Sequence, residues 1–240
     1  MKIRIKEKII NSRIVRSVVR HDFTDTPLNR SERVFNNFFL HLHPVKIKEH
    51  ALKFSYTFCL GGISAALFII LTITGILLMI YYHPSVPQAY YDMKDLQFVV
   101  SSGTFLRNVH RWSAHLMVVT VFLHMLRVFY RGAYKPPREF NWVVGVLLLI
   151  VTLLFSFTGY LLPWDQLSYW AITVGTTIAS YIPVLGKTIR FLLLGGNRVG
   201  DSSLLRFYVL HCTILPAVII VLMAIHFWRV RKDGGISGPL

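Results

Sequence analysis

Four long apolar runs, separated by polar or proline-containing stretches, set the pattern of this 240-residue chain. They cover about residues 54–82, 109–130, 142–162 and 207–228. Each run is long enough to cross roughly 30 Å of hydrocarbon as a helix, with some tilt in the longest. Prolines follow the first run at Pro84 and Pro87 and the third at Pro163, and a proline ends a helix. The pattern therefore predicts an all-α membrane protein, a bundle of four transmembrane helices.

The stretches between and before the runs predict less regular structure. Residues 83–109 are predicted to form a polar connection, and RGAYKPPR at 131–138 is predicted to form a short basic turn. Residues 163–206 are broken by Pro183 and several glycines, so we expect one or two short helices along the membrane surface. Residues 1–50 form a basic extension, separate from a four-span domain at 51–240. The extension fits an amphipathic surface helix at 3–19 and a solvated basic segment equally well.

Composition and charge support a membrane location. Apolar residues make up 54% of the chain and charged residues 15%, against about a quarter charged in soluble proteins. The net charge is +15, but the basic residues gather in the first 53 residues and at the ends of the apolar runs. This distribution is typical of anchoring at an anionic membrane surface and speaks against nucleic-acid binding.

The basic flanks also predict an orientation. Four spans bring the N-terminal extension, the 131–138 turn and the basic residues at 229–232 to one side of the membrane. Basic flanks mark the cytoplasm-like, negative (n) side, so both termini are expected there. The surface helices of 163–206 are then expected on the opposite, positive (p) side.

Two of the predicted spans each carry two histidines. His110 and His124 are fourteen residues apart, and His211 and His226 are fifteen apart. Fourteen residues of helix span roughly 21 Å and bring two side chains within about 40° of the same face. Titratable groups are costly inside a bilayer and usually have a partner or a function there.

The topology pairs these histidines by depth. The second and fourth spans run in the same direction, so His110 and His211 share the p-side depth and His124 and His226 the n-side depth. Two facing imidazoles at each depth would ligate one b haem, giving two haems stacked across the bilayer. Four unrelated helix histidines would not be expected to match in depth. His115, five residues after His110, points elsewhere and is expected to pack without a ligand role.

Glycines give a second pattern at the same depths. Gly61 and Gly75 on the first span are fourteen residues apart, as are Gly145 and Gly159 on the third. Glycine lets a backbone approach a large flat group closely. We expect these four glycines to leave room for the haems, with ordinary small-residue helix packing as the alternative.

Five stretches resemble the cytochrome b6 family, the four-span haem subunit of cytochrome b6f and related Rieske/cytochrome b complexes. They are HRWSAHLMVV with LHMLRVF, GAYKPPREFNWVVGV, FTGYLLPWDQ, LRFYVLH and RKDGGISGPL. The resemblance covers about residues 51–240. It implies two b haems, with His110 and His211 at a low-potential p-side centre. It also implies that Cys59, in the CLGG setting, carries a c-type haem on the n side through one thioether. Without the resemblance, Cys59 reads as a buried apolar cysteine.

The resemblance suggests further site residues. Arg107, Arg111 and Arg231 are expected to neutralise haem propionates, a role that is compatible with anchoring at the membrane boundary. A p-side quinol pocket is expected near Gly159, where the candidates are Pro163, Trp164, Tyr169 and Ala171. An aromatic residue at the boundary can equally be an interface anchor.

The implied function is electron transfer in a quinol-oxidising complex with coupled proton translocation. The chain would be one subunit of a quinol:cytochrome c or plastocyanin-type oxidoreductase, and this subunit is expected to be inactive alone. The implied partners are a subunit IV-like chain, a Rieske iron–sulfur protein, a c-type cytochrome, quinone and a second copy of the complex. A bacterial energy-transducing membrane is favoured over a thylakoid. One rival function is a dihaem anchor of a dehydrogenase or hydrogenase, and another is a haem-free transporter or scaffold. The quinone, the final acceptor and the role of the basic extension stay open.

Overall fold

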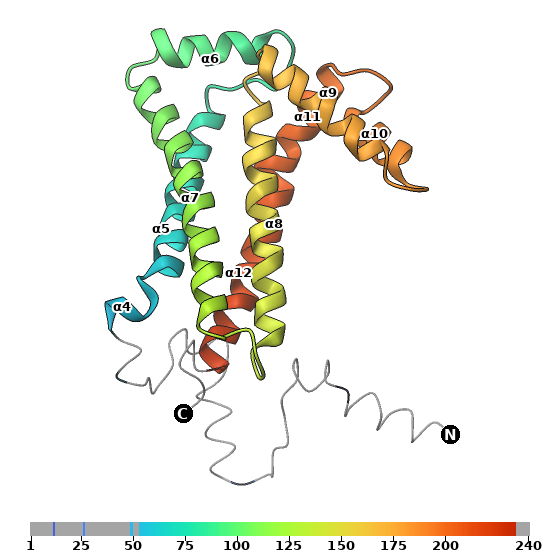
Figure 1. Ribbon diagram of the computed structural model, residues 1–240. Coiled ribbons are helices and arrows are strands. Elements are labelled where there is room, and N and C mark those ends of the chain that lie inside the picture. The colour runs from blue at the N-terminus through green and yellow to red at the C-terminus, as the bar shows by residue number, and fades with distance from the viewer. Residues whose placement is uncertain (1–11, 13–25, 27–48, 50–52, 234–240) are drawn as a thin grey trace. The chain divides into compact units, whose positions relative to one another are not determined.

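The computed structural model describes residues 12, 26, 49 and 53–233 (Figure 1). Within these residues the regular elements are helices, which confirms the all-α prediction. Four helical stretches among them are long and apolar enough to cross a membrane. The amphipathic helix considered at 3–19 lies outside the described residues.

The bounds of the four long stretches differ from those of the apolar runs that predicted them, and the first stretch is shorter than its run. The stretches are α5 (Leu60–Met79), α7 (Gly103–Tyr130), α8 (Glu139–Leu161) and a continuous stretch, Asp201–Lys232. The last comprises α11 (Asp201–Val209), a π-turn η2 (Leu210–Ile214) and α12 (Leu215–Lys232). The second and fourth stretches begin about six residues before their apolar runs. Backbone hydrogen bonding continues through polar turns, which an apolar pattern does not register.

The first predicted span is divided near its beginning. A short helix, α4 (Phe54–Thr57), is separated from α5 by Phe58 and Cys59. Both residues adopt the left-handed region, with φ of 53° and 52°. This conformation is uncommon for residues other than glycine and ends α4.

Besides α4, the described residues form three shorter helices outside the four long stretches. The short helices expected in 163–206 are α9 (Gln166–Ser180) and α10 (Gly186–Leu194). Asp165 caps α9, where its carboxylate accepts from the Ser168 N–H at 2.8 Å. The polar connection 83–109 contains a helix that the sequence did not predict, α6 (Gln88–Phe98). Figure 1 shows α6 running across the ends of α5 and α7 that it connects.

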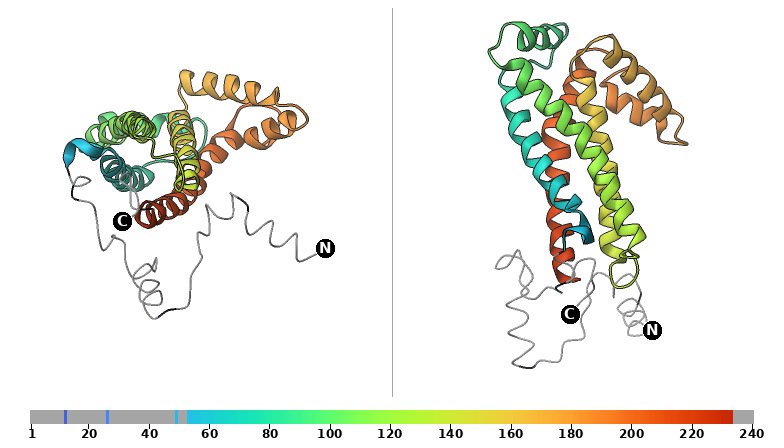
Figure 2. Two further views of the ribbon diagram at one scale, coloured as in Figure 1. Left: turned by 60° about the horizontal axis from the view of Figure 1, so that its bottom comes forward. Right: turned by 60° about the vertical axis from the view of Figure 1, so that its left-hand side comes forward.

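The chain divides into two compact units, and the long helices contribute to both. Unit 1 comprises Met1–Gly61, Val121–Leu149 and Ile220–Leu240, and unit 2 comprises Gly62–Thr120 and Ile150–Ile219. Within unit 2, the two further views show α9 and α10 side by side as a helical hairpin (Figure 2). Each unit contains one of the two expected histidine pairs.

Two small apolar clusters form the buried core of unit 2. One consists of Leu161, Ile172, Leu194 and Phe207, and the other of Tyr82, Ala89 and Leu204. Trp164 packs against both clusters, and the Tyr82 hydroxyl donates to the Leu162 carbonyl at 2.7 Å. Burial raises the pKa of the Tyr82 phenol, so this hydroxyl stays a donor. The clusters fix the loop after α8 against α9 and α11.

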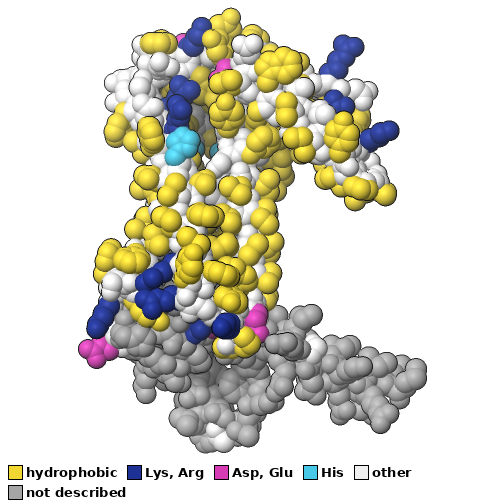
Figure 3. Space-filling model, in the orientation of Figure 1, with side chains coloured by type: hydrophobic (Ala, Val, Ile, Leu, Met, Phe, Trp, Pro, Cys, Tyr) yellow, Lys and Arg dark blue, Asp and Glu magenta, His cyan; other side chains and the backbone are white. Residues whose placement is uncertain are grey.

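The long helices expose large apolar side chains along their length. Ile69, Ile73 and Ile76 on α5, for example, are 59%, 55% and 58% exposed. Figure 3 shows hydrophobic side chains covering the visible face of the helices. A surface of this kind is stable in lipid, which agrees with an integral membrane protein that crosses the bilayer several times.

A hydrogen-bonded clip holds the beginning of α6. The buried Asp92 carboxylate accepts from the His83 backbone at 2.6 Å, the His83 ring at 3.0 Å and the Gln88 amide at 2.7 Å. Burial by itself would raise the pKa of this carboxyl, but these hydrogen bonds hold it below its usual value. In the same connection, Asp201 accepts from the Val86 N–H at 2.6 Å, which ties this loop to the start of α11.

Candidate functional site

In unit 2 the imidazole rings of His110 and His211 face each other. His110 comes from α7 and His211 from the π-turn η2. Their ring centroids are 6.4 Å apart, with an interplanar angle of 70°. The Phe155 ring packs edge-on against His211, with centroids 5.4 Å apart.

The π-turn explains how two different spacings produce matching pairs. The Leu215 N–H donates to the Leu210 carbonyl, a bond that takes one more residue per turn than the α-helical bond. The fifteen residues from His211 to His226 therefore complete the same number of turns as the fourteen from His110 to His124. Pro216, which lacks an N–H, follows directly and cannot bond to the Cys212 carbonyl, so it favours the bulge there.

In unit 1 the rings of His124 and His226 form the second pair. His124 comes from α7 and His226 from α12. Their ring centroids are 6.3 Å apart, with an interplanar angle of 81°. The structure thus brings together the four histidines in the two pairs that the sequence predicted. The remaining histidine of α7, His115, is exposed and packs against the Trp112 ring.

Each of the four predicted glycines faces one imidazole ring. A methyl group on Gly75 would lie 3.3 Å from Cε1 of His110, and one on Gly159 would lie 2.6 Å from Cε1 of His211. In unit 1 the corresponding distances are 3.2 Å from Gly61 to His124 and 3.8 Å from Gly145 to His226. Three of these four distances are tighter than ordinary van der Waals contact, so the glycines determine where the rings can lie.

Two threonines contact the histidines of unit 2. Thr74 Oγ1 lies 2.8 Å from Nδ1 of His110, and Thr158 Oγ1 lies 3.0 Å from Nδ1 of His211. Each threonine directly precedes a predicted glycine, Gly75 or Gly159, on α5 or α8. Neither threonine was among the predicted site residues, although the repeated Thr-Gly pair is visible in the sequence.

The ring separations fit two imidazoles on opposite faces of one haem iron. Metal–imidazole bonds are about 2 Å and the ring centre lies about 1.2 Å behind the nitrogen, so ligating rings have centroids about 6.4 Å apart. Both pairs meet this separation. Among the described residues there is no group of three or more His, Cys, Asp and Glu that could hold a metal ion. Two imidazoles suit haem, because the macrocycle supplies the other ligands.

Cys59 lies in unit 1, in the break between α4 and α5. It is exposed, and its backbone N–H donates to Thr57 Oγ1 at 3.2 Å. Its φ of 52° directs the chain away from α4 just before Gly61, which faces His124. The second cysteine, Cys212, is half-buried inside the π-turn. Exposure makes Cys59 the more accessible thiol for covalent attachment.

Arg127 fixes the segment that precedes Cys59. Its guanidinium donates to the Ser55 carbonyl at 2.7 Å and to the Tyr56 carbonyl at 3.1 Å. It also lies over the Phe58 ring, 4.8 Å from the centroid. Arg127 follows His124 by three residues, one helical turn, and the sequence analysis did not single it out.

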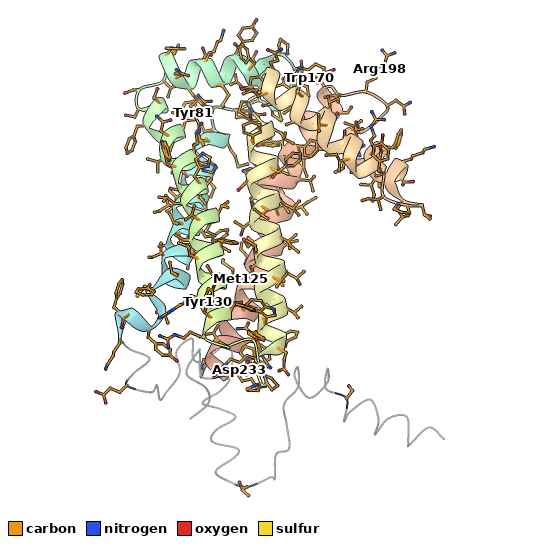
Figure 4. All side chains as sticks on the ribbon, viewed as in Figure 1. Tyr81, Met125, Tyr130, Trp170, Arg198 and Asp233 are labelled. Carbon is orange, nitrogen blue, oxygen red and sulfur yellow. The ribbon has the colours of Figure 1, made fainter. Side chains whose placement is uncertain are left out.

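The three arginines expected at haem propionates differ in exposure. Arg107 is half-buried with its guanidinium 3.4 Å from the Gln97 amide oxygen, Arg111 is exposed, and Arg231 is only 9% exposed. Beside Arg231, Arg229 is fully buried and forms an ion pair with Asp233 at 3.3 Å. Figure 4 labels Asp233 at the end of α12 and Tyr130 at the end of α7, both in unit 1.

The residues expected at a quinol pocket lie where α8 turns into α9. Trp164 has a positive φ of 51°, and its ring packs edge-on against Tyr169 with centroids 6.4 Å apart. Ala171 packs against the core cluster around Leu161. Pro163 lies in the turn itself. These contacts account for the fold of the turn, and a quinone-binding role stays a prediction.

Comparison with known proteins places this geometry in a family. The family model described as cytochrome b/b6/petB matches residues 45–234. The chain belongs to the cytochrome b family. Cytochrome b6 of Heliomicrobium gestii is 46% identical over 198 residues, 82% of this chain and 91% of that protein. Cytochrome b6 of Acaryochloris marina is 45% identical over 183 residues, 76% of this chain and 85% of that protein.

A solved structure supports the same assignment. A hyperthermophilic respiratory Complex III matches 90% of this chain with a TM-score of 0.70 and 30% identity. This chain spans only 55% of the chain in that structure. Family membership makes the protein a haem-bearing, multi-pass membrane subunit of a Rieske/cytochrome b complex, and so part of an oxidoreductase. The cofactors that this family implies are b-type haems.

Proposed function

We propose that the chain carries electrons across the membrane in a complex that oxidises quinol on the p side with coupled proton translocation. The observation that supports this most directly is the pair of facing-histidine sites, with centroids 6.4 and 6.3 Å apart. His110 and His211 hold one b haem, and His124 and His226 hold the other. Haem held by these two imidazole pairs would supply single-electron transfer rather than oxygen binding.

The protein contributes position and surroundings to this transfer. Gly75 and Gly159 allow the helices of unit 2 to approach the rings of His110 and His211. The surrounding apolar helices keep the sites dry, and α7 contributes one ligand to each site, with the two ligands fourteen residues apart in the sequence. Arg107, Arg111 and Arg231 neutralise propionates at the two ends.

We further propose that Cys59 carries a c-type haem on the n side. The Cys59 thiol adds across one vinyl group, forming a carbon–sulfur bond, while its proton goes to the other vinyl carbon. No oxidant or reductant is needed. The exposed thiol in the break after α4 and the neighbouring Gly61–His124 contact support this role.

The proposed partners are a subunit IV-like chain, a Rieske protein and a c-type cytochrome, in a dimeric complex. Two residues of the turn between α8 and α9, Pro163 and Trp164, are proposed to contact quinol together with Tyr169 and Ala171 from the beginning of α9. The membrane is proposed to be that of a bacterium, with both termini on the n side.

Absorption spectroscopy tests the haem assignment. The purified wild-type complex should contain two b haems per chain by pyridine haemochrome, and His226→Leu should lose one of them. His115→Leu is the matched control, because it removes an exposed histidine of α7 outside both pairs. Full b-haem content in His226→Leu, or an equal loss in His115→Leu, would contradict the assignment.

Haem staining of a denaturing gel tests the covalent cofactor. Denaturation releases b haems but leaves thioether-linked haem on the chain. The wild-type band should stain, Cys59→Ala should not, and Cys212→Ala should stain like the wild type. An unstained wild-type band would refute the c-type haem and would favour the dihaem dehydrogenase-anchor alternative.

A further inference from the structure

Two threonine hydroxyls occupy equivalent positions in unit 2. Thr74 on α5 and Thr158 on α8 are 7% and 4% exposed. Each hydroxyl lies beside Nδ1 of one histidine, at 2.8 Å for His110 and 3.0 Å for His211. Each threonine also precedes the glycine that faces the same ring.

The direction of these hydrogen bonds follows from the hydroxyl's single proton. Thr74 donates that proton to the Ile70 carbonyl at 2.7 Å, with the Leu71 carbonyl at 3.3 Å. Thr158 donates to the Leu154 carbonyl at 2.8 Å, with the Phe155 carbonyl at 3.2 Å. With the proton directed to the helix backbone, the threonine oxygen can only accept from the ring. Nδ1 of each histidine therefore carries a proton, and Nε2 keeps its lone pair.

The pair in unit 1 lacks this arrangement. The residues before Gly61 and Gly145 are Leu60 and Val144, whose side chains have no hydroxyl. Nδ1 of His226 has no hydrogen-bond partner among the described residues. The two sites thus share ring geometry and glycine contacts but differ in what accepts the Nδ1 proton.

We propose that Thr74 and Thr158 are positioning residues that lower the reduction potential of the haem held by His110 and His211, relative to the haem held by His124 and His226. The inference rests on the proposed haem function. A hydrogen bond accepted from Nδ1–H makes the imidazole a stronger electron donor through Nε2. A stronger donor stabilises the oxidised, more positive iron, and this lowers the potential. The difference favours electron movement from the site in unit 2 to the site in unit 1.

Potentiometric titration of the intact complex tests this inference. Thr74→Val and Thr158→Val keep the side-chain shape and remove the hydroxyl acceptor, while the Leu71 and Phe155 carbonyls, which also hydrogen-bond His110 and His211, stay in place. Each should raise the potential of one haem, changing its reduced-to-oxidised ratio at a fixed ambient potential by about five- to tenfold. Tenfold corresponds to about 59 mV for a one-electron couple. The potential of the second haem should not move. The corresponding serine variants, which keep the hydroxyl, should titrate like the wild type.

Matched controls lie two residues away on the same helices. Thr72→Val on α5 and Ser156→Ala on α8 remove hydroxyls that donate only to the Phe68 and Thr152 carbonyls, so neither should shift a potential. If a valine variant fails to assemble, Thr74→Ala and Thr158→Ala make the same measurement without added bulk. Two b haems with unshifted potentials in the valine or alanine variants would overturn the inference and leave the haem function standing. Shifts of the same size in the controls would also overturn it. A wild-type complex without b haem would instead refute the proposed function.

Discussion

The backbone N–H of Leu215 donates to the carbonyl of Leu210, five residues earlier in the chain. This π-turn bond absorbs one residue between His211 and His226, and it lets a fifteen-residue spacing pair with the fourteen-residue spacing of α7. π-turns of this kind are often found at functional sites, where they reorient a side chain.

The π-turn predicts that the two histidine helices differ in their response to a one-residue deletion. Deleting Thr213 within the turn places His211 and His226 fourteen positions apart, a spacing that an ordinary α-helix accommodates with the rings still on one face. Deleting Val119 from α7 places His110 and His124 thirteen positions apart and rotates one ring by about 100°. We expect two b haems per chain after the first deletion and at most one after the second, measured by pyridine haemochrome. Equal haem loss in the two deletions would contradict the conclusion that the π-turn compensates for the extra residue between His211 and His226.

Gly159 should be the least replaceable of the four site glycines. A methyl group there would lie 2.6 Å from Cε1 of His211, so Gly159→Ala must displace the ring or α8. We expect destabilisation of about 1–3 kcal/mol and a changed low-spin haem signal in electron paramagnetic resonance. Gly62→Ala is the control, because a methyl group there meets nothing within 4 Å. An unperturbed signal in Gly159→Ala would show that the backbone yields without moving His211.

The Asp92 clip should make stability depend on pH in the acidic range. The hydrogen bonds from His83 and Gln88 hold the pKa of the native carboxyl below the usual 3.8. The stabilisation is therefore complete above about pH 5 and is lost as the pH falls through the native pKa, because the unfolded chain binds the proton first. Asp92→Asn should cost about 1–3 kcal/mol at neutral pH and flatten this acid dependence, measured by thermal unfolding in detergent. Asp95→Asn makes the same charge change at an exposed position of α6 and should retain the wild-type profile.

Arg127 should support covalent haem attachment without touching the thiol. It holds the Ser55 and Tyr56 carbonyls and the Phe58 ring just before Cys59. Arg127→Gln is expected to loosen α4 by about 1–2 kcal/mol and to lower the haem-stained fraction of the chain severalfold. Lys53→Gln, which removes an exposed positive charge beside α4, should stain like the wild type. Wild-type staining in Arg127→Gln would restrict the arginine to a structural role.

The sequence by itself determined the fold class, the four spans and the pairing of the histidines. Long apolar runs leave a chain few options in a bilayer, because unbonded backbone groups are too costly there. The number of spans then fixed their directions, and the directions fixed which histidines share a depth. The four glycines were expected to leave room for haems, which stays a prediction, and the structure shows that each of them faces one of those rings.

Only the tertiary structure decided the features that depend on local backbone geometry or on neighbours from other helices. The break at Phe58 and Cys59, the helix α6 in a polar connection and the π-turn leave no mark on an apolar pattern, which reports burial and not hydrogen bonding. The threonine contacts to His110 and His211 join side chains 36 and 53 residues apart. Such contacts arise only when helices pack, so the repeated Thr-Gly pair can mark the two threonines but does not show which ring each hydroxyl will meet.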